Sequence, residues 1–355
     1  MRRIAGIAAL LVLVMLLTTI IDISFVNPFN IMNIMRWSGL FGILSLGEAF
    51  PIMTGGIDLS VGSIVGLIGA LSAYFVHMRQ WPIAAVLLLC LSLSLLMGYF
   101  HGVLVTKIKM QPFVVTLCGL FIYRGLARFA MQDMTQGYGN GFIGLKFLAH
   151  GKLPSALWPE GAAPRFLADW SLPMPFLIIV VVGIILAIFL NRSVYGRYIL
   201  ALGRNEAAAR FSGINTDRMT IVSYMIASTC AGLGGVLFSL DLNTVQPSTA
   251  GNMYELYAIA GCVVGGVSLK GGEGNILGVI IGTAIVRVLY NAINILGIAT
   301  TLEFAVVGSV ILVGVGADEV IKTLGAQRRL AEIRAAAMGE GRRPPSEAHK
   351  ASKSP

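Results

Sequence analysis

The sequence predicts an all-α, polytopic integral membrane protein with about ten transmembrane helices, two of them short and interrupted by glycine. Its 355 residues are 56% hydrophobic and only 12% charged, with a mean hydropathy of +0.81. Soluble domains carry about 25% charged residues. Apolar stretches of about 20 residues, the length that spans a bilayer as a helix, recur along the chain. Its 42 glycines suit close packing of such helices.

Ten segments of the chain are long and apolar enough to be candidate spans. They lie near residues 4–21, 38–54, 60–77, 83–105, 112–130, 173–190, 219–240, 254–268, 275–297 and 302–317. The second and eighth contain glycines and are short, so we expect broken or re-entrant helices there. The first resembles a signal peptide, but it ends in Asp22 without a small-residue cleavage pattern, so we interpret it as a retained span.

The placement of Lys and Arg predicts the orientation. With Arg2 and Arg3 in the cytoplasm, alternation of the spans places most of the 26 basic residues on the cytoplasmic side, including those of the tail. We therefore expect both termini in the cytoplasm. The predicted organisation is a transmembrane domain with one long outer loop, a basic cytoplasmic loop, and a basic, partly disordered cytoplasmic tail; the ranges are 1–317 for the domain, 131–172 and 191–218 for the loops, and 318–355 for the tail.

Two glycine-rich stretches lie between apolar runs and share a pattern. Residues 54–66 read TGGIDLSVGSIVG, and residues 265–278 read GGVSLKGGEGNILG. The Gly-Gly pair, one leucine and a Gly-x-Ile-x-Gly group recur with two residues inserted. Hydrocarbon disfavours irregular backbone and a carboxylate such as Asp58, so these breaks need protein, water or the membrane surface around them. A plain polar turn is the simpler interpretation.

The predicted topology puts both stretches toward the cytoplasmic side. We expect two equivalent turns, flexible or tightly packed, one in each half of the chain. Their residues Gly56, Asp58, Ser60 and Gly266 are accordingly interpreted as structural or gating residues.

Ionisable residues within apolar spans are functional candidates because burying a charge in a membrane is costly. For Arg124, Arg128 and Glu303, which lie near span ends, we favour side chains that reach the membrane surface. Glu48 lies inside the second span and Arg287 inside the ninth, so the two could pair. Glu48 could also be the proton relay of a proton-coupled carrier.

Arg287, Asn291 and Asn294 are spaced four and three residues apart and share one helix face. That face could line a polar path for a hydroxyl-rich solute, or it could form a hydrogen-bonded seam between helices. Both interpretations stay open.

Familiar catalytic and metal-binding patterns are absent from the sequence. The four cysteines and four histidines are dispersed without ligand spacing, so neither a metal site nor a disulfide is expected. No phosphate-binding GxxxxGK[ST], GxSxG or HExxH pattern occurs. We therefore expect no enzyme activity in this chain, and if ATP drives it, another chain binds the ATP.

The cytoplasmic loop contains a predicted helix at residues 204–210, reading RNEAAAR. Alanine, glutamate and arginine are strong helix formers. Asn205 is a plausible N-cap, with Glu206 in the first turn, and Ser212-Gly213 would end the helix. A helix here is not needed to span the membrane, so it is a surface connector or a docking element for a soluble partner.

Three motifs in order resemble the permeases of bacterial monosaccharide ABC importers of the ribose, xylose and galactose type. They are GGIDLSVGS at 55–63, YGRYILALGRNEAAARFSGIN at 195–215 and YELYAIAGCVVGGVSLKGGEGNILGVIIG at 254–282. The resemblance covers about residues 4–317. It implies a homodimeric permease of the bacterial inner membrane with a central translocation path. It also implies a periplasmic sugar-binding protein outside and an ATP-binding subunit inside, so that this chain holds no cofactor.

In this family the cytoplasmic loop before the seventh span couples the permease to the ATPase. Carried onto this sequence, the coupling residues are Gly203, Arg204, Asn205, Glu206, Ala207, Ala208, Arg210, Ser212 and Gly213. The residues expected in the path or its gate are Glu48, Gly56, Asp58, Ser60, Gly266, Arg287, Asn291 and Asn294.

The sequence also bears on three alternatives to a sugar permease. A branched-chain amino-acid ABC permease shares the second glycine-rich motif, but the GIDLSVG form at 56–62 is the sugar-type version. A proton-coupled carrier would depend on Glu48. A membrane enzyme or receptor is remote, and no nucleic-acid module is implied. The sequence does not indicate which sugar is carried.

Overall fold

The computed structural model describes residues 2–139, 141–159 and 169–302, with a few single residues between and after these ranges. The chain divides into two compact units, Met1–Val307 and Gly308–Pro355, and only the first is described in detail. The predicted tenth span, Glu303 and the tail fall almost wholly outside the described residues. The predicted border at residue 317 falls there too.

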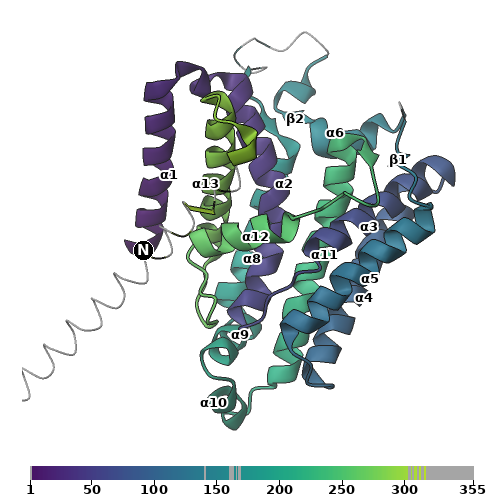
Figure 1. The fold of residues 1–355 in the computed structure, drawn as a ribbon, viewed down its shortest axis with the longest axis vertical. Helices are drawn as coiled ribbons and strands as arrows, with labels where there is room; N and C mark the ends of the chain where they lie inside the picture. Colours follow the sequence, from purple (N-terminus) through teal and green to yellow (C-terminus); the bar gives the residue numbers. More distant parts are fainter. Residues whose placement is uncertain are drawn as a thin grey trace, which may run out of the picture. The chain divides into compact units, whose positions relative to one another are not determined.

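The first unit is built almost wholly of helices, as predicted (Figure 1). Its long helices are α1 (Arg2–Ile21), α2 (Pro28–Met53), α3 (Val61–Ala73), α4 (Ile83–Thr106), α5 (Pro112–Met131), α8 (Met174–Arg192), α11 (Thr216–Leu242) and α13 (Ile276–Ile295). Shorter ones are α6 (Ile143–His150), α9 (Val194–Arg204), α10 (Glu206–Phe211) and α12 (Tyr254–Val264). Among the described residues, seven helical segments are long and apolar enough to cross a membrane, α3 counting together with the π-helical turn Tyr74–Met78 that continues it.

Helix α2 lies at the centre of this unit, and every residue from Ser38 to Met53 is buried. It is longer than the predicted second span and continuous over 26 residues. It begins at Pro28, where the Asn27 side chain accepts a hydrogen bond of 3.0 Å from the Phe29 N–H.

The glycines of α2 permit close packing and do not break the helix. A Cβ at Gly47 would lie 2.6 Å from the Cβ of Cys230 on α11, and one at Gly39 would overlap the backbone of Pro175 on α8. Small residues let helix backbones approach in this way. The predicted break therefore follows α2, at residues 54–60.

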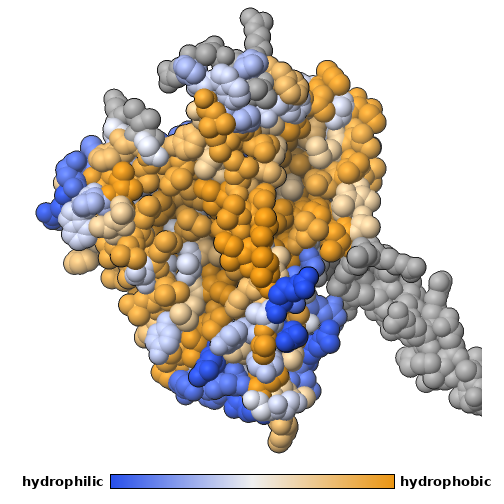
Figure 2. Space-filling model, turned by 180° about the vertical axis from the view of Figure 1, so that it is seen from behind, coloured by the Kyte–Doolittle hydropathy of each residue, from blue (hydrophilic) through white to orange (hydrophobic). Residues whose placement is uncertain are grey.

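The helices form an inner and an outer set. Most residues of α3, α11 and α13 are buried, whereas only 6% of the α1 span and 28% of the α4, α5 and α8 spans are. The outward faces of this outer set carry large apolar side chains such as Leu16, Leu96, Phe121 and Ile184. Figure 2 shows one such apolar face, with hydrophilic residues gathered at its lower end. These exposed faces match the surface that a lipid-embedded bundle presents.

The two ends of this unit differ. Helix α10 lies at the lower end in Figure 1, and α6 and the strands β1 and β2 lie at the upper end. Residues from the predicted outer loop form two short antiparallel pairs there, β1 (Gln136–Gly137) with β4 (Thr244–Val245) and β2 (Lys152–Leu153) with β3 (Leu172–Pro173). The buried Tyr138 hydroxyl fixes the loop, because it shares hydrogen bonds with Ser72 (2.6 Å) and Ser239 (2.8 Å).

Candidate functional site

Helix α10 has the start and the end that the sequence predicts. The Asn205 side-chain oxygen accepts a hydrogen bond of 2.9 Å from the Ala208 N–H, so Asn205 is the N-cap. Ser212 follows the last helical residue, and Gly213 adopts a φ of +82° that favours glycine. Arg204 is not part of this helix. It is the last residue of α9, a helix that was not predicted from the sequence.

Ion pairs tie α10 to its neighbours. Arg210 contacts Glu206 one turn earlier at 2.9 Å and Asp217, at the start of α11, at 3.1 Å. Asp217 also accepts from Lys107, just past the end of α4, at 2.8 Å. Exposed pairs of this kind each stabilise little. Together they set the orientation of α10 relative to α4 and α11.

The exposed side of α10 carries a large aromatic residue. Phe211 is 94% exposed, whereas Ala209 of the same helix is buried against the bundle. A nearly fully exposed phenylalanine next to Arg210, at the polar end of the unit, is suited to insertion into a protein partner. Phe211 lies in the predicted cytoplasmic loop but is not among the residues predicted to couple.

The two glycine-rich stretches form similar turns, but in a register shifted from the sequence match. Helix α2 ends with Gly55 at a φ of +87°, and α12 ends with Gly266 at +84°. In each case the next residue donates back to a carbonyl five positions earlier, as in a Schellman cap. Gly55 is thus equivalent to Gly266 and not to Gly265, and Gly56 is equivalent to Val267.

The second half of the sequence match is not structurally equivalent. Ser60 precedes α3 and Asn275 precedes α13, so these two residues correspond as N-caps. Gly62 therefore lies inside a helix, whereas its sequence match Gly274 lies before one. Gly62 packs against the backbone of Gly251, in the loop before α12.

Asp58 shapes the first turn from a fully buried position. Its carboxylate accepts hydrogen bonds from the N–H (2.9 Å) and hydroxyl (2.5 Å) of Ser60, and the Asp58 N–H donates to Glu48 Oε1 at 3.0 Å. His101 of α4 lies with Nδ1 3.9 Å from the other Asp58 oxygen. Gly56 leaves room for the Tyr224 hydroxyl, which lies 2.5 Å from where a Cβ would be. This buried polar group joins α2, α3, α4 and α11.

The end of α9, the end of α2 and the second turn meet in a contact made by backbone atoms. The Gly272 N–H donates a hydrogen bond of 2.9 Å to the Met53 carbonyl. A Cβ at Gly203 would overlap both of these groups. We call Met53, Gly203 and Gly272 the junction. It brings the end of α9, just before α10, into direct contact with the end of α2 and with the second glycine-rich turn.

A cavity of about 500 Å³ lies between α2, α12 and α13. The predicted path residues Arg287, Asn291 and Asn294 all line it. The other lining residues are Asn33, Ile34, Trp37, Phe41, Asn252, Met253, Tyr254, Tyr257 and Tyr290. The structure thus brings the three predicted residues together on one polar and aromatic wall.

Two details of that wall refine the prediction. The Arg287 guanidinium lies over the rings of Phe41 (4.0 Å) and Tyr257 (4.8 Å). A Glu48–Arg287 pair, which the sequence left possible, is not among the contacts between described residues: Glu48 Oε1 accepts from the Asp58 N–H, and Arg287 lies over these rings. Asn291 exchanges two hydrogen bonds with Asn30 of α2, at 3.0 and 2.7 Å, so it is both a cavity residue and part of a helix seam.

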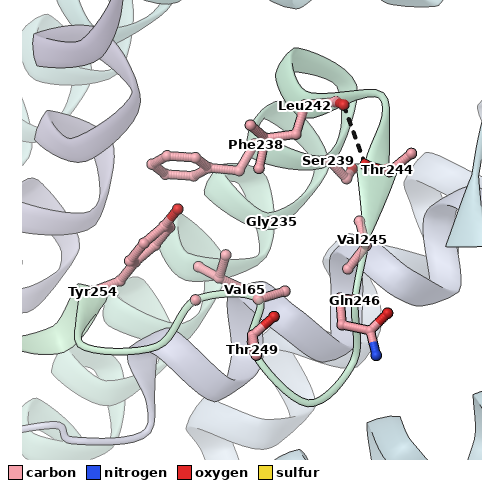
Figure 3. Close-up of a pocket in the computed structure, with 12 residues that line it drawn as sticks. Val65, Gly235, Phe238, Ser239, Leu242, Thr244, Val245, Gln246, Thr249 and Tyr254 are labelled. Carbon is pink, nitrogen blue, oxygen red and sulfur yellow. Dashed lines mark hydrogen bonds between the residues drawn. The ribbon is translucent and has the colours of Figure 1, made fainter. Parts of the chain in front are cut away.

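A second cavity, of about 250 Å³, lies beside α11 and the loop that leads to α12 (Figure 3). Ser239, Thr244, Gln246 and Thr249 supply its polar groups. Tyr254 lines both cavities, and its ring lies 4.7 Å from that of Phe238 and 4.8 Å from that of Phe41. These three rings separate the two spaces.

Two other ionisable residues, Arg124 and Arg128, lie in different surroundings. Arg124 was expected to reach the membrane surface, but it donates to the carbonyls of Pro247 (3.2 Å) and Ala250 and so holds the loop before α12. Arg128 is exposed and pairs with Asp133 at 2.8 Å, which agrees with its predicted place at a span end.

Sequence reasoning missed the aromatic residues of the first cavity and the partners of Asp58. Trp37 and Phe41 are four residues apart, and Tyr254 and Tyr257 are three apart, so the helical spacing used for Arg287 would have placed each pair on one face. His101 and Tyr224 gave no comparable signal, because each reaches the first turn from a helix far away in the sequence.

The chain matches the family model described as branched-chain amino acid transport system / permease component over residues 30–315. It belongs to this family of membrane permeases. The permease is similar to the ribose import permease protein of Bacillus subtilis, with 35% identity covering 90% of this chain and 93% of the relative. It is similar to that of Escherichia coli K12 at 36%, covering 87% and 91%. No solved structure matches it.

The xylose transport system permease protein of Escherichia coli K12 is also similar, at 30% identity over 89% of this chain and 91% of the relative. These relatives are transport permeases and not enzymes. The residues that the family model matches, 30–315, include the two cavities, the two turns and α10. The permease is therefore a multi-pass membrane protein.

Proposed function

We propose that this permease is the membrane-spanning subunit of an ATP-binding-cassette importer that carries a monosaccharide. The observation that carries the proposal is the cavity of about 500 Å³ together with the ribose and xylose permeases that the chain resembles over nearly its whole length. The amino-acid alternative named in the family description is not favoured, because the similar relatives are sugar permeases.

The chemistry of the cavity suits a hydroxyl-rich ring. Trp37, Tyr254 and Tyr257 offer aromatic faces on which the apolar side of a sugar can stack, while Asn33 and Asn294 offer amide groups to its hydroxyls. A few placed polar groups among apolar walls are typical of small-molecule sites. Arg287 adds N–H donors at the edge of the same space.

The energy comes from a separate ATP-binding subunit that docks on α10. Phe211 fits an apolar pocket of that partner, and Glu206 and Arg210 set the rim around it. ATP is bound by the partner, so this chain needs no cofactor. The residues 203–208, Arg210, Ser212 and Gly213 retain the coupling role expected of them.

The same proposal gives the orientation of the permease and its other partners. The α10 end faces the cytoplasm, with both termini on that side of the bacterial inner membrane. A periplasmic sugar-binding protein delivers the solute to the opposite end, and a second copy of the permease completes a homodimer. Closure of the ATPase subunits moves α10 and shifts the permease between outward-open and inward-open packings.

The test is co-purification of the permease with its ATP-binding partner subunit. Scrambling Glu206 to Phe211 should abolish co-purification while the permease still inserts into the membrane. A matched control scrambles Leu145 to His150 of α6, a short helix at the opposite end. Unchanged co-purification and unchanged uptake of the scrambled α10 variant would contradict the proposal.

A further inference from the structure

We propose that the junction of Met53, Gly203 and Gly272 is the inner gate of the permease. It closes the bundle at the α10 end, and movement of the coupling segment opens it by separating the second turn from the end of α2. The inference deepens the proposed function and rests on it, because a partner that binds α10 supplies the movement.

The junction is closed by backbone packing. The Gly203 Cα faces the Met53 carbonyl and the Gly272 N–H so closely that no side chain fits between them. Gly271, beside it, approaches both other segments, since a Cβ there would lie 2.9 Å from the Gly203 carbonyl and 3.1 Å from the Gly55 N–H. Three segments that lie far apart in the sequence are thus in direct backbone contact, and together they form the seal of the proposed gate.

The two described cavities lie on the other side of this seal. Their lining residues come from α2 up to Phe41, the second half of α13, the end of α11, the loop that follows it and the start of α12, and from α3 only Val65. The junction instead involves the last residue of α2 and the turn before α13. A solute in either cavity must therefore pass beyond the buried half of α2 to reach the α10 end.

The segment that connects α10 to the junction is short. Only Arg204 and Asn205 separate Gly203 from Glu206, the first residue of α10. Asn205 has an extended backbone and is fixed to α10 through its cap. Arg204 in turn packs on Gly272, where a Cβ would lie 2.8 Å from the Arg204 backbone nitrogen. A displacement of α10 is thus transmitted to the seal through two residues.

Glycines suit a contact that must open and close repeatedly. No side chains interlock between Gly203, Gly271 and Gly272, so the surfaces can separate without rotamer changes. One direct hydrogen bond, from Gly272 to Met53, spans the second turn and α2 at this point. Neighbouring Gly274 accommodates the Met53 side chain, whose Cγ lies 3.0 Å from where a Gly274 Cβ would be.

The distance between the Met53 Cγ and a Cβ at position 274 allows a disulfide to hold the gate closed. A cysteine at position 53 would carry its Sγ near the present Cγ, at about the distance from a Cβ at position 274 that a disulfide requires. The double variant M53C/G274C is made with Cys118, the exposed native cysteine, replaced by alanine. It is studied as the full transporter complex in proteoliposomes, with the monosaccharide that the parent complex takes up.

We expect the oxidised double variant to form the disulfide and to lose uptake at least tenfold, with recovery on reduction. Each single-cysteine variant, whatever its own level of uptake, should show the same uptake under oxidising and reducing conditions. Full cross-linking with unchanged uptake would overturn the gate, and so would a folded double variant that does not cross-link. Absence of ATP-dependent uptake by the parent complex would instead contradict the proposed function.

A second variant keeps the inference testable if the double variant does not fold. G203A places a methyl group against the junction, whereas G125A on α5 places one in open space. We expect G203A to retain co-purification with the ATPase and to lose uptake at least tenfold, with G125A unchanged in both. G203A uptake at the level of G125A would overturn the inference.

Discussion

The backbone N–H of Gly272 donates a hydrogen bond of 2.9 Å to the carbonyl oxygen of Met53. This bond joins the end of the central helix to the turn before α13, and Gly203, near the end of α9, covers it. A Cβ at Gly271 of the second glycine-rich stretch would lie 3.1 Å from the Gly55 nitrogen of the first, so the two stretches are parts of one contact.

Phe211 should be the main apolar anchor for the ATP-binding subunit. Replacing it with alanine should weaken the complex about tenfold or more, equivalent to about 1.4 kcal/mol, because exposed aromatic residues dominate many interfaces. The measurement is the dissociation constant between purified permease in nanodiscs and the ATPase. Phe129, which is 84% exposed on the apolar helix α5, provides the control F129A. Equal affinities of the two variants would show that Phe211 is not an anchor.

Asn205 should determine how well α10 is formed. N205A removes the acceptor for the Ala208 N–H and should destabilise the helix by about 1 kcal/mol. Hydrogen exchange at the α10 amides should then accelerate roughly fivefold, since 1.4 kcal/mol corresponds to about tenfold. N205D, which keeps a capping oxygen, should exchange like the parent. Acceleration in N205D equal to that in N205A would rule out capping as the cause.

Asp58 should stabilise the first turn more than Ser60 does. D58A removes acceptors for both the N–H and the hydroxyl of Ser60 and leaves these donors buried, at a cost of about 2–4 kcal/mol. S60A removes one donor and keeps the backbone bond, so about 1 kcal/mol is expected. Thermal unfolding in one detergent gives the order of the midpoints. A lower midpoint for S60A than for D58A would contradict this account of the turn.

Features that depend on residues within one helical turn could be predicted from the sequence, whereas features that depend on packing between distant segments could not. The cap at Asn205 and the end of α10 at Gly213 were predicted because they depend on residues within one turn. Helix α9 was missed, since Gly196 and Gly203 lower its helix propensity and its stability comes from packing. A Cβ at Gly196, for example, would lie 2.5 Å from the Leu190 Cα.

Longer-range features could not be predicted from one sequence. The spacing placed Arg287, Asn291 and Asn294 on one face, but Trp37 and Tyr254 reach that face from other helices. The match of Gly55-Gly56 to Gly265-Gly266 found two real turns and misjudged their register by one residue. Only the backbone shows that Gly55 and Gly266 have the positive φ angles.

Arg287 should matter for transport through the cavity. R287Q shortens the side chain and removes its charge, its stacking on Phe41 and most of its N–H donors. We expect kcat/KM for uptake to fall about tenfold, or about 1.4 kcal/mol. The control R128Q removes an exposed arginine that pairs with Asp133. A loss of uptake in R128Q equal to that in R287Q would contradict a cavity-specific role.

The most direct test of the central claim is uptake by a reconstituted complex. The permease is placed in proteoliposomes with its ATP-binding subunit, and the binding protein loaded with labelled monosaccharide is added outside. The account predicts uptake that requires ATP inside and is unaffected by a proton uncoupler. Uptake that continues without ATP, collapses with the uncoupler and fails in E48Q would contradict it and would identify a proton-coupled carrier.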